Sequence, residues 1–190
     1  MTDIVRPGAA LVFMKIGDHA GESLSDIIAR KRREIEDAGY GLWGYGGNTC
    51  HPLRMVQPFA QDYVKREGVI YLCMQPMTSR HFAITERATE ASADGVTWTT
   101  IPKAINVIGS RYALAIGDLR EEEVELPLAQ TRVAIGNSMG RRGDRYISGR
   151  VDKACLEVTE SEAEAGEPPA NTVEISFVAR LVEPYAVLVR

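Results

Sequence analysis

Residues 9–16 read Ala9-Ala10-Leu11-Val12-Phe13-Met14-Lys15-Ile16, a continuous apolar run that Gly17 and Asp18 close. A run of this length, bounded by a turn, suits a buried strand better than a helix, which usually needs about 10 residues or more. We therefore predict a strand over residues 9–16 and place it at the centre of a sheet.

A helix should follow this strand. Ser23 and Asp26 are N-cap candidates, apolar residues then recur at helical spacing, and Gly39 stands where such a helix would end. The basic run at residues 30–33 should face away from the apolar side and serve solubility, because acidic residues follow it at helical spacing. A second helix is expected to begin near Pro58, whose fixed φ suits a first turn, and to end at Gly68.

From residue 69 onward the sequence is typical of strands separated by Gly, Pro and polar turns. The expected strands cover residues 69–74, 80–85, 96–101, 111–116, 131–135, 145–158 and 172–188. Residues 157–170 contain five glutamates and two adjacent prolines, which predicts an exposed acidic loop. Together these elements predict one α+β domain over residues 1–190. Its mixed, mostly antiparallel sheet should be curled or form a partial barrel, with two main helices in the N-terminal half.

Composition narrows the function classes. A chain of 190 residues with 45% hydrophobic content can bury one core, and a net charge of −4 argues against coating nucleic acid over a large surface. Three scattered cysteines give no disulfide framework and favour a reducing compartment. The N-terminus has an acid where a signal peptide carries positive charge, and no apolar run approaches the ~18 residues of a membrane span. We expect a cytoplasmic protein without a membrane segment.

The segment with the most functional character is residues 39–52, which read Gly-Tyr-Gly-Leu-Trp-Gly-Tyr-Gly-Gly-Asn-Thr-Cys-His-Pro. Its glycines let the backbone approach a ligand, and Trp43 and Tyr45 offer flat faces for stacking a planar group. Asn48 and, as a weaker candidate, Trp98 complete the expected ligand-binding set. The alternative for each aromatic residue is a core anchor beside a sharp turn.

The order strand, helix, Trp-bearing turn, helix and antiparallel strands resembles the PUA-like superfamily, particularly its EVE and YTH branches. The resemblance covers about the first half of the chain and uses the strand at residues 11–15, the turn at residues 41–44, and the strands at residues 69–74 and 80–84. It implies a pocket that accepts a modified or flipped base between aromatic side chains, with Trp43 in that pocket. The lysine, glutamate and arginine pattern of the related ASCH branch is not recognisable, and the Trp turn is richer in glycine.

Cysteine chemistry is an alternative. Cys50 would act as a nucleophile if His81 or His51 served as its base, and with His81 as base the protein would be a transferase or hydrolase acting on a small polar substrate. Most isolated cysteines are small buried apolar residues, so we rank catalysis below packing. The three cysteines and three histidines show no paired ligand spacing, and we expect neither a metal nor a cofactor.

A second candidate region is the turn at residues 136–145, where glycines could form an amide nest and Arg141, Arg142 and Arg145 could hold a phosphate. It lacks the Gly-Lys-Ser/Thr ending of a P-loop, so we do not predict nucleoside triphosphate hydrolysis. The alternative is a solvated hairpin whose arginines pair with the acids of residues 118–125.

Our leading hypothesis is therefore a non-catalytic domain that binds a nucleobase-containing ligand, or single-stranded or modified nucleic acid. Trp43 would stack on the base and the three arginines would contact phosphate. A further alternative is a protein-interaction module of a mobile genetic element, which would engage a protein partner through an exposed strand edge or the acidic loop.

Overall fold

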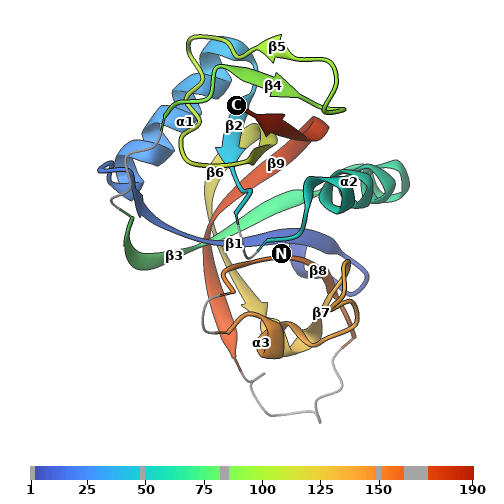
Figure 1. Cartoon of the computed structure of the whole chain (residues 1–190). Helices are drawn as coiled ribbons and strands as arrows, with labels where there is room; N and C mark the ends of the chain where they lie inside the picture. The colour runs from blue at the N-terminus through green and yellow to red at the C-terminus, as the bar shows by residue number, and fades with distance from the viewer. Residues whose placement is uncertain (1–2, 48–49, 82–85, 149–150, 161–170) are drawn as a thin grey trace.

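The computed structural model describes residues 3–47, 50–81, 86–148, 151–160 and 171–190. Within these ranges one nine-stranded mixed sheet has the order β2-β6-β9-β3-β1-β8-β7, and β4 and β5 extend it from β9 (Figure 1). The strands are β1 (Ala10–His19), β2 (Gly41–Gly44), β3 (Tyr71–His81), β4 (Glu90–Ser92), β5 (Thr99–Thr100), β6 (Tyr112–Pro127), β7 (Thr131–Val133), β8 (Lys153–Val158) and β9 (Thr172–Val189). The helices are α1 (Leu24–Ala38), α2 (Leu53–Glu67) and the single turn α3 (Gly143–Tyr146), with 3-10 turns at Asp3–Val5 and Leu128–Gln130.

The sheet is mixed because β1 and β3 pair in parallel while the other pairs are antiparallel. The crossover between the parallel strands contains α1, β2 and α2, as parallel neighbours require a long connection. The sheet curls but does not close on itself. The predicted α+β class, the mostly antiparallel curled sheet and the two main helices in the N-terminal half are confirmed.

Helix α1 has the ends that its sequence predicts. The Ser23 hydroxyl accepts a hydrogen bond from the Asp26 N–H at 3.2 Å, and Gly39 adopts a left-handed φ of 81° while its N–H bonds to Ile35 O. Helix α2 ends before Gly68 as expected but begins at Leu53, so the predicted start near Pro58 is wrong. Pro58 lies on the exposed side of α2, where water can satisfy the carbonyl that its missing N–H leaves free.

Several predicted strand boundaries are also wrong. Residues 145–148 are not strand, because α3 ends there and β8 begins only at Lys153. The strand expected over residues 96–101 is reduced to β5, since the Asp94 carboxylate accepts the N–H groups of Val96 and Thr97 and turns the chain. Residues 80 and 81 belong to β3, whereas residues 82–85 lie outside the described residues. Of the predicted acidic loop, Glu157 and Val158 belong to β8, and residues 161–170 lie outside the described residues.

The Trp-bearing segment, expected to be a turn, is an edge strand. Gly41 and Trp43 of β2 pair with Ile116 and Leu114 of β6. A Cβ on Gly44 would lie 2.3 Å from the Ser110 hydroxyl oxygen, so glycine is needed there for this hydroxyl to approach the strand. The glycines of this segment thus allow close packing in a sheet.

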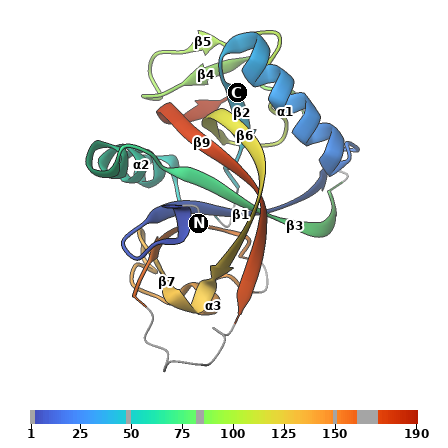
Figure 2. The same ribbon diagram turned by 180° about the vertical axis from the view of Figure 1, so that it is seen from behind.

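The long strands β6 and β9 run side by side through the molecule and define its two ends (Figures 1 and 2). Helix α1, β4 and β5 lie at one end, and β7 and α3 lie at the other. The largest buried cluster packs α1 and α2 against the sheet, with Val12, Ile28 and Tyr63 among its members. In this arrangement a common space is surrounded by the C-terminal end of β1, the start of α1 and the strand β2.

Candidate ligand-binding cavity

A cavity of about 460 Å³ lies between the end of β1, the beginning of α1, β2 and the segment that precedes β6. Its wall includes residues 14–20, Trp43 and Gly44, residues 106–110, and Asp152 and Lys153 at the start of β8. Small-molecule sites in proteins commonly have volumes of about 300–1,000 Å³ and combine apolar walls with a few polar groups. This cavity meets both criteria.

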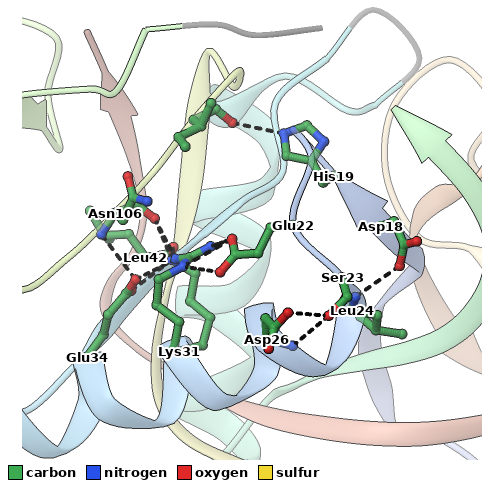
Figure 3. A network of polar contacts seen from close by, with 12 residues as sticks. Asp18, His19, Glu22, Ser23, Leu24, Asp26, Lys31, Glu34, Leu42 and Asn106 are labelled. Atoms are coloured by element: carbon green, nitrogen blue, oxygen red, sulfur yellow. Dashed lines mark hydrogen bonds and ion pairs between the residues drawn. The ribbon is translucent and has the colours of Figure 1, made fainter. Parts of the chain in front are cut away.

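One wall of the cavity is held by a buried ion-pair network on α1. Lys31 is 4% exposed, and its ammonium donates to the Glu34 carboxylate at 2.8 Å, to Asn106 O at 2.8 Å and to Leu42 O. Arg30 donates to Glu34 at 2.7 Å and to Glu22 at 2.6 Å. Figure 3 shows Lys31 and Glu34 pointing together from α1 toward Leu42 and Asn106. The network ties α1 to β2 and to the segment before β6.

This network corrects the expectation that residues 30–33 all face solvent. Lys31 and Glu34 follow Ile27 by four and seven residues, so they lie on the same helical stripe as that buried side chain. Burial lowers the pKa of Lys31 to about 8, and the Glu34 carboxylate opposes that shift. All three ammonium hydrogens have acceptors, which makes Lys31 a structural cation of the cavity wall.

Trp43 lines the cavity and also belongs to the main core cluster. It is only 5% exposed, so most of the indole is covered by neighbouring side chains and a small part of the ring faces the cavity. Trp43 is therefore a core anchor at the edge of the cavity, and its contact with a ligand stays a prediction.

The polar lining includes an acceptor without a donor. Asn106 Oδ1 is buried and has no hydrogen bond with any described residue, although the main chain of Asn106 binds Glu34, Lys31 and Arg30. His19 and Ser110 also line the space, and His19 Nε2 lies 3.3 Å from Ile108 O. Buried polar groups are normally hydrogen-bonded, so Asn106 Oδ1 is an exception at a residue of the cavity wall.

The other aromatic candidates lie elsewhere. Tyr45 is 1% exposed, packs beside Tyr112 with ring centroids 5.7 Å apart, and does not line the cavity. The Trp98 ring lies under the Arg190 guanidinium at 4.0 Å and is also outside the cavity wall. Asn48 lies outside the described residues. Ligand contact by these three residues remains a prediction.

The arginine turn lies apart from the cavity. Arg141, Arg142 and Arg145 are exposed, and none of them lines the space around Trp43. Arg142 forms an ion pair with Asp144 at 2.6 Å. The turn leads into α3, at the end of the molecule opposite α1 (Figure 1). A role of these arginines in phosphate binding stays a prediction that is separate from the cavity.

Cys50 sits in a local turn. Its sulfur lies 3.0 Å from the Gly47 N–H and 3.2 Å from Gly47 O, while the neighbouring His51 stacks on Tyr146 with ring centroids 6.0 Å apart. Burial lowers the pKa of His51 below its ordinary value. His81 pairs with His19 through the backbone of β3 and β1, and its side chain lies outside the described part of the structure. The Cys50–His81 pair therefore stays a hypothesis.

Comparison with known proteins identifies no matching family model, curated protein or solved structure. Among the described residues, no helix is long and apolar enough to span a membrane. In the same part of the chain, no three His, Cys, Asp or Glu side chains come together as a metal-binding group.

Proposed function

We propose that this protein binds a small nucleobase-containing ligand in the cavity beside Trp43. The observation that supports the proposal most directly is that Trp43 and the amide residue Asn106 line one cavity of about 460 Å³. A purine or pyrimidine is flat and carries N–H groups on its edge, so it can contact an apolar wall and donate to an amide oxygen at once. The order β1, α1, β2, α2, β3 agrees with the element order that underlies the resemblance to PUA-like domains, and that kinship is part of the proposal.

Trp43 acts in this proposal as an apolar wall for the base. Its limited exposure makes stacking of a whole base on an open indole face a poor fit to the free protein. The ligand that fits best enters the cavity as a mononucleotide or as one extruded base of a single strand, because a duplex base pair would need a wider opening.

The direct test is a fluorescence titration of a Trp98→Phe variant, in which Trp43 is the single remaining tryptophan. Nucleoside 5′-monophosphates and short single-stranded RNA should change the Trp43 emission in a saturable way. Trp98 lies outside the cavity, so its replacement by another aromatic ring should leave binding intact.

Asn106→Leu tests the amide side chain at the cavity wall without disturbing the ion-pair network. The contacts of Asn106 with Lys31, Arg30 and Glu34 use its main chain, so they persist in the variant. Loss of one buried hydrogen bond should weaken binding by about 5- to 100-fold. Asn137→Leu on an exposed turn is the matched control. Equal affinity of Asn106→Leu and Asn137→Leu would count against the proposed site.

A further inference from the structure

Lys153, the first residue of β8, brings a mostly buried ammonium group to the wall of the Trp43 cavity. Its side chain is 16% exposed, and it pairs with Met14 of β1, which lines the same cavity. The one ion pair of Lys153 among the described residues is with Asp152 Oδ1, at 3.9 Å. This distance is too long for a hydrogen bond, so the three N–H donors of the ammonium have no hydrogen-bonded acceptor in the described part of the chain.

The space beside this ammonium is open. A Cβ built on Gly47 would meet one described atom within 4 Å outside its own stretch of chain, and that atom is Lys153 Nζ, at 3.9 Å. Gly47 lines the cavity together with Gly46 and Trp43, which precede it in the chain. A Cβ on Gly46, in contrast, would lie 2.5 Å from the Tyr112 ring, so the chain is tightly packed there. The Lys153 ammonium therefore borders unfilled space where the glycine-rich segment forms the cavity wall.

The cations of α1 on the same wall are already engaged. Arg30 and Lys31 both donate to the Glu34 carboxylate at hydrogen-bond distance. Lys153 differs because its attraction to Asp152 acts over 3.9 Å, and the Coulomb energy falls as the separation grows. An anionic oxygen at the usual distance of about 2.8 Å would interact with the ammonium more strongly than Asp152 does. A charged group that is mostly buried thus favours an anionic ligand in the space beside it.

We infer that the ligand of this cavity carries a phosphate group, which the Lys153 ammonium binds while the base lies against Trp43. The inference rests on the proposed function, since it assigns the acidic group of the nucleobase-containing ligand. An ammonium is a compact charge with three rotatable donors and commonly binds phosphate. A free nucleotide and a nucleic-acid strand both supply this group.

Calorimetric titration with nucleosides, their 5′-monophosphates and ribose 5-phosphate tests the inference. The wild-type protein should bind a 5′-monophosphate about 10- to 100-fold more tightly than the nucleoside with the same base, the effect of hydrogen bonds to a charged group. Lys153→Met keeps an apolar stem without the ammonium, and should abolish this difference while leaving the nucleoside affinity unchanged. Lys65→Met is the matched control and should retain the difference, because Lys65 forms a similarly long ion pair, 4.0 Å to Asp62, on the exposed side of α2.

Asp152→Asn tests the same contact with the opposite sign. Its carboxylate repels a phosphate bound to Lys153, so neutralising it should tighten monophosphate binding by about 3- to 10-fold and leave nucleoside binding unchanged. The hydrogen bond from the Lys15 N–H to Asp152 O, at 2.8 Å, uses the main chain and persists in the variant. A merely structural effect of Asp152→Asn would weaken binding of both ligands.

The outcomes separate the two proposals. Equal affinity of nucleoside and monophosphate, or a difference that survives in Lys153→Met, would overturn the phosphate assignment and leave the nucleobase site standing. Ribose 5-phosphate that binds as tightly as the monophosphates, and only in the presence of Lys153, would support the phosphate site and overturn the nucleobase function. Absence of binding by every ligand, in a protein shown to be folded by circular dichroism, would overturn both.

A 3′,5′-linked dinucleoside monophosphate distinguishes the two sources of phosphate. Tight binding of this ligand that depends on Lys153 would assign the phosphate to a strand. Binding at the level of a nucleoside, with tight and Lys153-dependent binding of the 5′-monophosphate, would assign it to a free nucleotide.

Discussion

Glu34→Gln should strongly destabilise the protein, because this carboxylate is the common partner of two cations inside the fold. Glu34 is 1% exposed and accepts from Arg30 at 2.7 Å, from Lys31 at 2.8 Å and from the Asn106 N–H at 3.1 Å. Glutamine keeps the volume but removes the charge and directs an NH₂ group at one or two of these donors. Removing one partner of a buried ion pair costs about 3–5 kcal/mol.

Urea and thermal unfolding followed by circular dichroism measure this loss. For a chain of this size about 1 kcal/mol corresponds to roughly 2–4 °C, so the midpoint should fall by roughly 6–20 °C. Glu36→Gln on the same helix is the matched control, because Glu36 is exposed and its neutralisation should change the free energy of unfolding by less than about 0.5 kcal/mol.

The pH dependence of the loss identifies its cause. Burial lowers the pKa of Lys31 in the folded protein to about 8 from an ordinary value of 10.5, so the folded state binds fewer protons than the unfolded state between these values. Wild-type stability should therefore gain from this group as pH rises through that window. Without the Glu34 carboxylate the pKa of Lys31 falls further. The rise in stability with pH therefore begins at a lower pH in Glu34→Gln than in the wild type. The difference in free energy of unfolding between the wild type and Glu34→Gln should therefore be smaller at pH 9.5 than at pH 7. If Glu34→Gln and Glu36→Gln had the same free energy of unfolding at pH 7, the ion-pair network would not be a determinant of stability.

Three other predictions concern packing and titration. Gly143→Ala should destabilise the protein by about 1–3 kcal/mol in urea unfolding, because its Cβ would overlap Thr131 Oγ1. The double variant with Thr131→Ala should recover part of this loss. Tyr112→Phe should lower the free energy of unfolding by about 1–3 kcal/mol, because the Tyr112 hydroxyl donates to the buried His51 carbonyl; an unchanged urea midpoint would contradict this. Hydrogen bonds from two backbone N–H groups and a serine hydroxyl hold the pKa of the Asp94 carboxyl well below its ordinary 3.8, so its NMR signal should remain that of the ionised form at pH 3.5. The stability from Asp94 is present above its unfolded pKa and is lost as pH falls.

The parts of the fold that depend on neighbours in sequence could be predicted. The cap of α1 at Ser23 and its end at Gly39 follow from local hydrogen bonds and backbone freedom. The apolar run at residues 9–16 predicted a central strand, and β1 lies between β3 and β8. The start of α2 could not be placed, since Pro58 is tolerated on an exposed helix face and is an unreliable mark of the first turn.

The cavity depends on contacts between distant segments, and sequence reasoning found only the part of its wall that the glycine-rich segment with Trp43 supplies. Asn106 and Asp152 show no motif of their own, because only the fold brings these two residues to the wall of one cavity. One signal was present: Lys31 and Glu34 stand at i+4 and i+7 from Ile27, on the apolar stripe. The basic composition of residues 30–33 concealed it, since a charge run is usually solvated.

The position of β9 also has a consequence for how the protein is made. β9 pairs with both β3 and β6, and it follows both in the chain. A nascent chain that has emerged only as far as residue 160 has an open backbone edge on each of these strands. The sheet can therefore be completed only after residues 172–189 have left the ribosome. We expect the growing chain to bind chaperones that hold extended apolar segments, and to be most prone to aggregation when synthesis stalls just before β9.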